Sequence, residues 1–579
     1  MRIIFMRFTW KIGGEAGFGI MTTGLLFSKI ANRLGYYTFD YIEYPSLIRG
    51  GHNAFEAIVS DEEVHGLKKE IDFLVCLNAD TFKYHKQRLT SESVVLYDPD
   101  EFAIEQENII RISVPFKKIL SDLKGQPVMK NTIAMGASLA ILGSDLSILN
   151  EMLDKQFSRK GEAVVDFNKK FASLGFDQVR KNFPTQTKPL LKKREDEQKL
   201  VMSGNEAFSL GAIAADCRLY CAYPMTPSSS VLTTLASWQE KTGIIVRHAE
   251  DEISVINTAL GGSFAGVRSA VGTSGGGFAL MVESVSLAGI TETPIVIFIA
   301  QRPGPATGMP TWTEQGDLLF ATFAGHGEFP KIVLAPGDVE EMTTLTAEAF
   351  NFADIYQTPV LVMSDMFLSE SHKTMKKSFL DKFLDEYKVN RGKTIDTFSS
   401  SSKYLRYQLT EDGISPRLIP GFKGQYYQAN SYEHVEDGHT TEEALARKQQ
   451  VEKRNKKLDT YLLNHFKPPK VFGNIETSQT IFVSWGTTKG PILEAQAILR
   501  GMGIETAFIH FTHIYPLKEE VIAPLFKDSQ KRYVLLENNS HGQFGKLLRM
   551  ETGLELQEKL LKYDGRPFWP EEIVESIKI

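Results

Sequence analysis

The sequence predicts an α/β protein made of three doubly wound α/β domains joined by linkers. At 579 residues the chain is longer than one hydrophobic core usually supports, so several domains are expected. Its apolar runs have the length of strands and alternate with helical patterns, an order typical of parallel sheets. A strand, a glycine-rich loop and a helix open the chain, which is the usual start of a doubly wound domain.

Composition excludes several classes of protein. A chain with 42% hydrophobic and 23% charged residues is expected to be soluble and globular. A net charge of −6 offers no electrostatic footprint for nucleic acid or for an anionic membrane. The N-terminal apolar run is interrupted by Arg7, so it lacks a signal-peptide core, and the longest apolar stretches are too short to span a membrane. Three cysteines form no disulfide framework, and we expect a cytoplasmic protein.

The first predicted domain covers residues 1–186. Its strand (8–12) and glycine loop (13–19) precede a helix, and a second buried strand follows at 72–79. The helix carries Leu25, Leu26, Ile30 and Leu34. The glycine spacing is not that of a dinucleotide site, and no acidic residue follows a convincing second strand. A tight turn in a doubly wound fold is therefore the favoured interpretation, with NAD binding as the alternative.

A charged, proline-containing stretch at residues 187–200 is predicted to be a linker, followed by a second α/β domain at 201–375. Apolar strands are expected at 218–223, 244–246, 269–272, 295–300 and 360–363. Two helical patterns are expected to bury Val231, Leu235 and Trp238, and Ile253, Ile256 and Leu260.

The remaining sequence divides into a polar part and an apolar part. Residues 376–475 predict a charged connecting arm, or a packed helix with a solvated face. The last domain, 476–579, is again α/β, with strands at 480–486, 505–511 and 532–538.

Chemically useful side chains gather at the strand ends of the second domain. In an open parallel sheet, ligands bind outside the carboxyl ends of the strands. Those ends carry Thr226, the acids of HAEDE (248–252), Thr273, Ser274, Gln301 and Arg302. Arginine reads a carboxylate through two parallel hydrogen bonds, so a substrate acid is expected.

Simpler explanations stand beside this one. Arg302 can equally be paired with a structural acid, and Glu250 and Asp251 can serve the N-terminus of a helix. Cys217 and Cys221 lie in an apolar strand and are expected in the core. A [4Fe–4S] cluster needs about four thiolates, so none is expected in this chain, and no metal site is predicted.

Four segments of the second domain are specific in combination: YPMTPSS, EDEISVINTALGGSFAG, GTSGGGFALMVE and QRPGPATGMPTWTEQGDL. They resemble the α subunit of 2-oxoacid:ferredoxin oxidoreductases, in particular the 2-oxoglutarate (KorA-type) branch. The opening glycine loop, YPSLIRGG (44–51) and NTIAMGA (131–137) resemble the γ subunit of that family, fused here at the N-terminus. Segments GISPRLIPG, SWGTTKG and HFTHIYPL resemble the rest of the α subunit. Gly276 and Ala306 depart from the family pattern, which often has proline and serine there.

The resemblance implies a γ-type domain, a thiamine-pyrimidine-binding domain and a transketolase C-terminal-like domain. It also implies an enzyme that uses thiamine pyrophosphate and coenzyme A, decarboxylates a 2-oxoacid and passes electrons to ferredoxin. A separate β subunit is expected to hold the pyrophosphate, Mg²⁺ and a [4Fe–4S] cluster, in a dimer of heterodimers. The sequence agrees in containing no GDG magnesium motif.

By resemblance, Glu252 is the catalytic carboxyl that hydrogen-bonds the aminopyrimidine ring and favours its imino tautomer. Thr226 and Arg302 are expected to hold the substrate carboxylate. Cofactor contacts are expected from Tyr223, Pro224, Glu252, Thr273 and Ser274. Arg49 falls in a family-matched loop near coenzyme A, without an assigned role. Pyruvate or branched 2-oxoacids remain alternative substrates, and an NAD-dependent dehydrogenase or a non-catalytic scaffold remains an alternative of another class.

Overall fold

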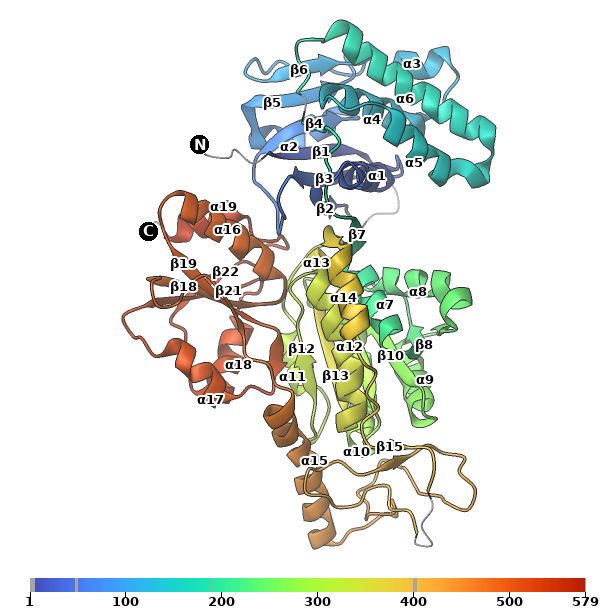
Figure 1. Cartoon of the computed structure of the whole chain (residues 1–579), viewed down its shortest axis with the longest axis vertical. Helices are drawn as coiled ribbons and strands as arrows, with labels where there is room; N and C mark the ends of the chain where they lie inside the picture. The colour runs from blue at the N-terminus through green and yellow to red at the C-terminus, as the bar shows by residue number, and fades with distance from the viewer. Residues whose placement is uncertain (1–5, 47–49, 189, 399–402, 578–579) are drawn as a thin grey trace. The chain divides into compact units, whose positions relative to one another are not determined.

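A computed structural model describes residues 6–46, 50–188, 190–398 and 403–577. The chain forms two compact units. Unit 1 comprises residues 1–202, 371–381 and 569–572, and unit 2 comprises residues 203–370, 382–568 and 573–579. The division into five segments expected from the sequence is finer than this, and its boundaries stay predictions. Both units are α/β, as predicted (Figure 1).

Unit 1 is built on a mixed sheet of eight strands in the order β6-β5-β4-β1-β3-β2-β14-β7. Strand β3 runs antiparallel to both of its neighbours, β1 and β2, whereas β1, β4, β5 and β6 are parallel. The strands are β1 (Arg7–Glu15), β2 (Tyr37–Glu43), β3 (His52–Ser60), β4 (Ile71–Cys76), β5 (Leu89–Tyr97), β6 (Ile110–Ser113), β7 (Lys199–Ser203) and β14 (His372–Lys376).

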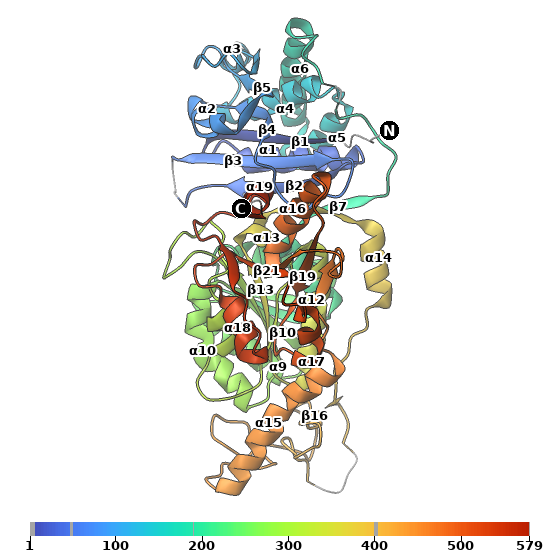
Figure 2. The same cartoon turned by 90° about the vertical axis from the view of Figure 1, so that its left-hand side faces the viewer.

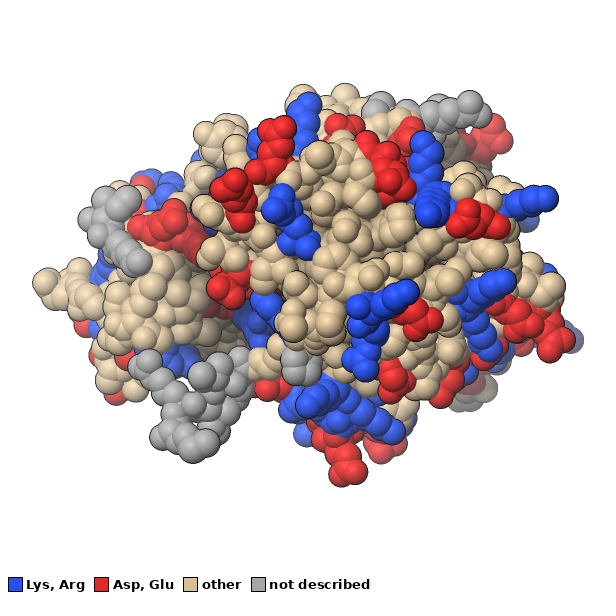
Figure 3. All heavy atoms as spheres, turned by 90° about the horizontal axis from the view of Figure 1, so that it is seen from above, with Lys and Arg blue, Asp and Glu red and all other residues tan. Residues whose placement is uncertain are grey.

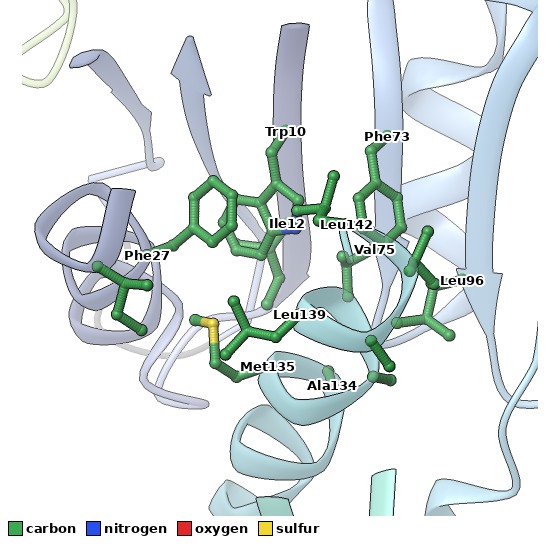
Figure 4. Close-up of a cluster of buried hydrophobic side chains, with 14 of the residues drawn as sticks. Trp10, Ile12, Phe27, Phe73, Val75, Leu96, Ala134, Met135, Leu139 and Leu142 are labelled. Carbon is green, nitrogen blue, oxygen red and sulfur yellow. The ribbon is translucent and has the colours of Figure 1, made fainter. Parts of the chain in front are cut away.

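The helices of unit 1 include α1 (Ile20–Arg33), α4 (Lys130–Ile141), α5 (Ser147–Phe157) and α6 (Glu162–Asn182). Helices α4 and α6 pack at very short distance because each has a glycine at the contact. A Cβ at Gly136 would lie 1.9 Å from the carbonyl oxygen of Ala172, so only glycine fits there. The core between sheet and helices is apolar, with the rings of Trp10 and Phe27 stacked 4.2 Å apart (Figure 4).

The N-terminal strand is longer than predicted, because it continues through the glycines to Glu15. A Cβ at Gly13 would lie 2.7 Å from side-chain atoms of His52 and Thr81, so glycine allows this close packing within the sheet. Strand β1 has β3 and β4 as neighbours, and β2 is not beside it. The β1–α1–β2 segment therefore does not form the adjacent-strand unit of a dinucleotide-binding fold.

The charged stretch predicted as a linker lies along unit 1. The amide of Arg194 donates to the carbonyl oxygen of Leu34 (2.9 Å), and the hydroxyl of Tyr36 donates to that of Lys192 (2.9 Å). Leu191 is buried in the core of the same unit.

On the face that Figure 3 shows, basic and acidic side chains are interspersed, so this face has no extended basic stripe of the kind that binds nucleic acid.

Unit 2 contains a seven-stranded sheet in the order β20-β12-β13-β11-β10-β8-β9. All neighbours are parallel except β20, which is antiparallel to β12. The strands are β8 (Cys217–Ala222), β9 (Ile245–His248), β10 (Arg268–Thr273), β11 (Ile295–Gln301), β12 (Ile332–Leu334), β13 (Pro359–Asp365) and β20 (His513–Tyr515). Its helices include α7 (Gly204–Ala214), α8 (Ser229–Thr242), α9 (Glu252–Phe264), α10 (Gly275–Ile290), α11 (Leu318–Phe323) and α12 (Val339–Tyr356).

A second sheet of unit 2 has the order β17-β19-β18-β21-β22 and is turned toward the viewer in Figure 2. Its strands are β17 (Lys470–Phe472), β18 (Thr480–Trp485), β19 (Thr506–Phe511), β21 (Arg532–Glu537) and β22 (Glu558–Leu561), with helices α16 (Lys489–Gly501) and α18 (Gln543–Thr552). One continuous apolar cluster joins this sheet to the seven-stranded sheet, so the two layers share a core.

One prediction about a buried face is wrong. Ile253 is 51% exposed, because the apolar stripe of α9 is made by Val255, Ile256, Ala259 and Leu260 and lies about one residue away on the helix. Helix α15 (Ala444–Asn464) packs with one face and exposes the other, as the second interpretation of this segment expected, but its buried face is largely charged. Lys453 and Lys457 of that face bind the buried carboxylate of Glu292 at 2.6 and 2.5 Å.

Candidate functional site

The predicted site residues lie at one edge of the seven-stranded sheet. Strands β13, β11, β10, β8 and β9 are consecutive and parallel, so their carboxyl ends share this edge. Just beyond these ends come Thr226 after β8, Glu252 after β9, Ser274 after β10 and Arg302 after β11. Motifs that are far apart in the sequence therefore lie together at one edge of the sheet.

Glu252 is the first residue of α9 and is only 3% exposed. It occupies the same stripe of the helix as Val255, Ile256 and Ala259, so the buried face of α9 begins with a carboxylate. Asp251 caps the helix by accepting a hydrogen bond from the amide of Ser254 (2.7 Å), as the helix-terminus interpretation predicted for it. The Oε1 atom of Glu252 is buried without a hydrogen-bond partner in the described part of the chain. Such an atom is costly unless a ligand satisfies it.

The start of α10 is shaped around this carboxylate. A Cβ at Gly277 would lie 2.6 Å from Oε1 of Glu252 and 2.1 Å from Oγ1 of Thr273, so both oxygens converge on the space that glycine leaves. Thr273 and Ser274 are fully buried. Ser274 precedes α10 but makes no capping hydrogen bond with its side chain, and its Oγ has no partner among the described residues. The first turn of α10 therefore presents free polar groups inside a buried site.

Arg302 and Thr226 are in direct contact. The Nη1 of Arg302 donates to the carbonyl oxygen of Thr226 at 2.8 Å, so the bond runs to the backbone of Thr226. Burial lowers the pKa of Arg302, and the nearby charge of Asp317 partly offsets this effect. No carboxylate of the described residues forms an ion pair with Arg302. The guanidinium therefore keeps donors for a carboxylate from outside the chain.

Two acidic residues on the loop that follows Arg302 were missed in the sequence. Burial raises the pKa of Asp317 to about 6, and Arg302 partly offsets it. Burial and the charge of Asp317 raise the pKa of Glu314 to about 7. The signal for them was TEQGDL, two acids at the end of a glycine- and proline-rich loop that follows the strand carrying Arg302. Perturbed carboxyls beside a charge partner are typical of functional sites.

Gln301 serves the structure of the site. Its Nε2 donates to the carbonyl oxygen of Ser364 (3.0 Å), and its Oε1 accepts from the amide of Asp317 (3.0 Å). The loop is also held by the C-terminal layer, where the amide of Gln315 donates to the carbonyl oxygen of Asn538 at 2.7 Å. These hydrogen bonds fix the position of the Asp317 backbone.

The other predicted contacts lie at the rim or outside the described residues. Tyr223 is 39% exposed and Pro224 is exposed. The ring of Tyr223 lies 6.3 Å from that of His248, centroid to centroid. Arg49 lies outside the described residues. In unit 1, a cavity of about 360 Å³ opens beside the N-terminus of α1, with Gly19, Asn131 and Lys160 among its lining residues.

Cysteines and metal-ligating groups add no further site. Cys76, Cys217 and Cys221 are buried free thiols, the last two in the core as predicted. Across the described ranges, no three His, Cys, Asp or Glu side chains are grouped to hold a metal ion. No helix within those ranges combines the length and apolar character that crossing a membrane requires.

Comparison with known proteins places these features in a family context. A model described as "Pyruvate ferredoxin/flavodoxin oxidoreductase" matches residues 9–178. A second, "Pyruvate flavodoxin/ferredoxin oxidoreductase, thiamine diP-bdg", matches residues 210–453 and so contains all the predicted site residues.

Individual relatives agree with the family models. The 2-oxoacid:ferredoxin oxidoreductase subunit alpha of Sulfolobus sp is 32% identical, with 99% of this chain and 96% of the relative aligned. The 2-oxoglutarate synthase subunit KorA of Methanothermobacter thermautotrophicus is 30% identical over 65% of this chain and 97% of its own. The structure of 2-oxoglutarate:ferredoxin oxidoreductase from Magnetococcus marinus, with 2-oxoglutarate, coenzyme A and succinyl-CoA bound, has a TM-score of 0.91 at 29% identity and covers 99% of both chains.

Proposed function

The chain belongs to the family of 2-oxoacid:ferredoxin oxidoreductase α subunits, and from this premise we propose that it serves a 2-oxoglutarate:ferredoxin oxidoreductase. The proposed reaction converts 2-oxoglutarate and coenzyme A to succinyl-CoA and CO₂, and two electrons pass singly to ferredoxin. Two likenesses support 2-oxoglutarate over pyruvate or branched 2-oxoacids: the KorA relatives and the structure with 2-oxoglutarate bound.

The observation that carries the proposal is the buried, unpartnered Oε1 of Glu252. A buried carboxyl without a partner can form a hydrogen bond with a ring nitrogen of a bound ligand. That bond gives Oε1 the partner that the fold itself does not supply. We assign the aminopyrimidine of thiamine diphosphate to the space beside Glu252, Thr273 and Gly277. The unpartnered Oγ of Ser274 gives a second polar contact there.

The proposed reaction gives each of the main site residues a role. When bound, thiamine diphosphate would supply an acidic ring carbon whose deprotonated form is the nucleophile for the 2-oxo carbon of the substrate. Glu252 holds a proton between its Oε1 and the ring nitrogen that faces it, which is general acid–base work. Arg302, fixed by the carbonyl of Thr226, orients the substrate carboxylate through its remaining donors. The burial of Glu252 and Thr273 limits the access of water to this proton.

We propose that a β subunit completes the site and holds Mg²⁺, the pyrophosphate and the [4Fe–4S] cluster. Exposed apolar side chains beside the site support a partner surface, since large apolar groups around a buried polar centre are typical of interfaces. They are Ile253 (51% exposed), Leu280 (53%), Phe320 (39%) and Tyr223 (39%). A dimer of heterodimers is the expected assembly. A cytoplasmic location is proposed because buried free thiols suit a reducing compartment.

For coenzyme A, the cavity of unit 1 is the proposed contact region. The N-terminus of α1 has no side-chain cap, so its free amides suit a phosphate, and Lys160 adds a positive charge. Oδ1 of Asn131, which is buried and without a partner in the described chain, suits an amino group.

The test is reconstitution. The chain co-expressed with its β subunit is expected to reduce ferredoxin in a reaction that requires 2-oxoglutarate, coenzyme A and thiamine diphosphate, while the purified chain alone is inactive. Pyruvate and a branched 2-oxoacid are compared at equal concentration. Activity of the single chain, or a clear preference for pyruvate, would contradict the proposal.

A further inference from the structure

The loop that ends at Asp317 places its carboxylate beside the first residue of α10. A Cβ at Gly275 would lie 2.2 Å from Oδ2 and 2.6 Å from Oδ1 of Asp317, so the carboxylate fills the notch above the first residue of α10. The N-terminus of a helix favours a negative charge there. Asp317 is held in this notch by the bond from its own amide to Gln301.

Asp317 also acts on Arg302 electrostatically. The two charges influence each other, although they do not form an ion pair. The carbonyl of Thr226 accepts a hydrogen bond from the same guanidinium. Glu314 is a further titratable group that interacts with Asp317. The guanidinium is therefore bonded to a backbone oxygen and interacts electrostatically with the Asp317 carboxylate.

We propose that Asp317 is a positioning residue, the resident counter-charge of Arg302 that is neutralised by a proton when an anionic 2-oxoacid binds. The inference rests on the proposed function, because it needs a substrate carboxylate at Arg302. An arriving carboxylate brings a second negative charge toward the same guanidinium, and two carboxylates that share one site raise the pKa of one of them. Binding of the substrate is thus coupled to uptake of a proton by Asp317, with Glu314 able to share it.

The KM for the substrate is expected to depend on pH. When Asp317 is protonated, it no longer competes with the substrate carboxylate for Arg302, so the substrate binds more tightly. As pH rises through the range where burial places the pKa values of Asp317 and Glu314, about 6 and about 7, the competitor becomes charged and KM rises. A change of one pKa unit in Asp317 on binding corresponds to about a tenfold change in KM.

The experiment uses the assembled complex with its β subunit and measures KM and kcat for 2-oxoglutarate from pH 5.5 to 8.5. Wild type is expected to show a KM that rises about tenfold over this range. Asp317→Asn is expected to remove most of that rise and to have the lower KM at pH 8, with the effect on KM rather than on kcat. Glu328→Gln, an exposed carboxylate of the same unit, is the matched control and is expected to follow wild type.

A second readout does not depend on turnover. The folded state raises the pKa of Asp317 above its unfolded value, so its ionised form costs stability above that unfolded pKa. Asp317→Asn is therefore expected to melt at a higher temperature than wild type at pH 8 and at nearly the same temperature at pH 4. A variant KM raised equally at every pH, or a melting temperature lowered at pH 8, would overturn the inference. A folded wild-type complex that turns over no 2-oxoacid at any pH would overturn the proposed function, and the inference with it.

Discussion

The Nη1 of Arg302 donates to the carbonyl oxygen of Thr226 at 2.8 Å. Part of the guanidinium is thus used to fix its orientation, and the rest remains for a ligand. A planar fork can make both contacts at once, whereas the ammonium group of lysine is a single point of charge.

Arg302→Lys is therefore expected to raise the KM for the 2-oxoacid by roughly 10-fold to 100-fold, from the loss of a charged hydrogen bond of about 1.5–3 kcal/mol. The affinity for thiamine diphosphate is expected to change little. Steady-state kinetics and cofactor titration of the assembled complex separate the two effects, with Arg500→Lys on an exposed position as control. A collapse of cofactor affinity at constant KM would mean that Arg302 has a structural role only.

The first turn of α10 gives a matched pair of glycine variants. Gly277→Ala would place its Cβ 2.1 Å from Thr273 Oγ1 and 2.6 Å from Glu252 Oε1, so it must displace one of these oxygens. We expect loss of thiamine diphosphate binding and at least a 100-fold loss of activity, on the order seen when a positioned proton-transfer group is removed. Gly276→Ala meets only the carbonyl oxygen of Ala306, at 3.8 Å, and is expected to be tolerated. Equal activity of the two variants would show that the Gly277 notch is not part of the site.

Some residues of this site could be placed from the sequence and others could not. Strand ends could be read because parallel sheets bring them to one edge, which placed Thr226, Glu252, Ser274 and Arg302 together. Asp317 could not be placed this way, because it lies at the end of an irregular loop whose path is set by Gln301 and the C-terminal layer. That the backbone of Thr226, and not its hydroxyl, meets Arg302 is likewise beyond any residue pattern.

The fold was predictable to a similar extent. Long apolar strands such as Ile295–Gln301 were evident, because burial on both faces gives a continuous apolar run. The three-residue strand β12 was missed, since it is too short to show a pattern. The charged part of the buried face of α15 could not be predicted, because lysine usually indicates solvent, whereas Lys453 and Lys457 are buried against the carboxylate of Glu292.

This buried cluster gives a stability prediction. Glu292→Gln removes the carboxylate that pairs with both lysines and is expected to destabilise the protein by about 3–5 kcal/mol. Burial lowers the pKa of Lys457 to about 7, so this lysine can lose its proton and limit the cost at higher pH. Urea unfolding should therefore show a larger loss at pH 6 than at pH 8. Glu452→Gln, exposed on the same helix, serves as control, and a loss from it as large as that from Glu292→Gln would contradict the account.

Glu433 gives a prediction for acid stability. Burial alone would raise its pKa, but hydrogen bonds from Arg454 and Arg447 outweigh burial and lower the pKa to about 2. A carboxyl with a lowered folded pKa stabilises the fold above its unfolded pKa, and this contribution is lost as pH falls from about 4.5 toward 2. Its partial exposure limits the contribution to about 1–2 kcal/mol. Glu433→Gln should lower the melting temperature at pH 7 and make it less dependent on pH below 5. A variant with the acid dependence of wild type would show that the Arg454 pair contributes nothing.

In the proposed function, Glu252 provides the carboxyl that acts on the cofactor ring. Glu252→Gln keeps the shape of the side chain, so the fold and the assembly with the β subunit are expected to survive, and thiamine diphosphate should bind only modestly less tightly. Glu250→Gln, on the exposed neighbour, is the control.

The most direct measurement is the rate of proton–deuterium exchange at the thiazolium carbon of thiamine diphosphate bound to the assembled complex. Wild type and Glu250→Gln are expected to exchange at the same rate, and Glu252→Gln about 10²- to 10⁴-fold more slowly, the usual effect of losing a positioned proton-transfer group. Unchanged exchange together with full turnover in Glu252→Gln would contradict the account.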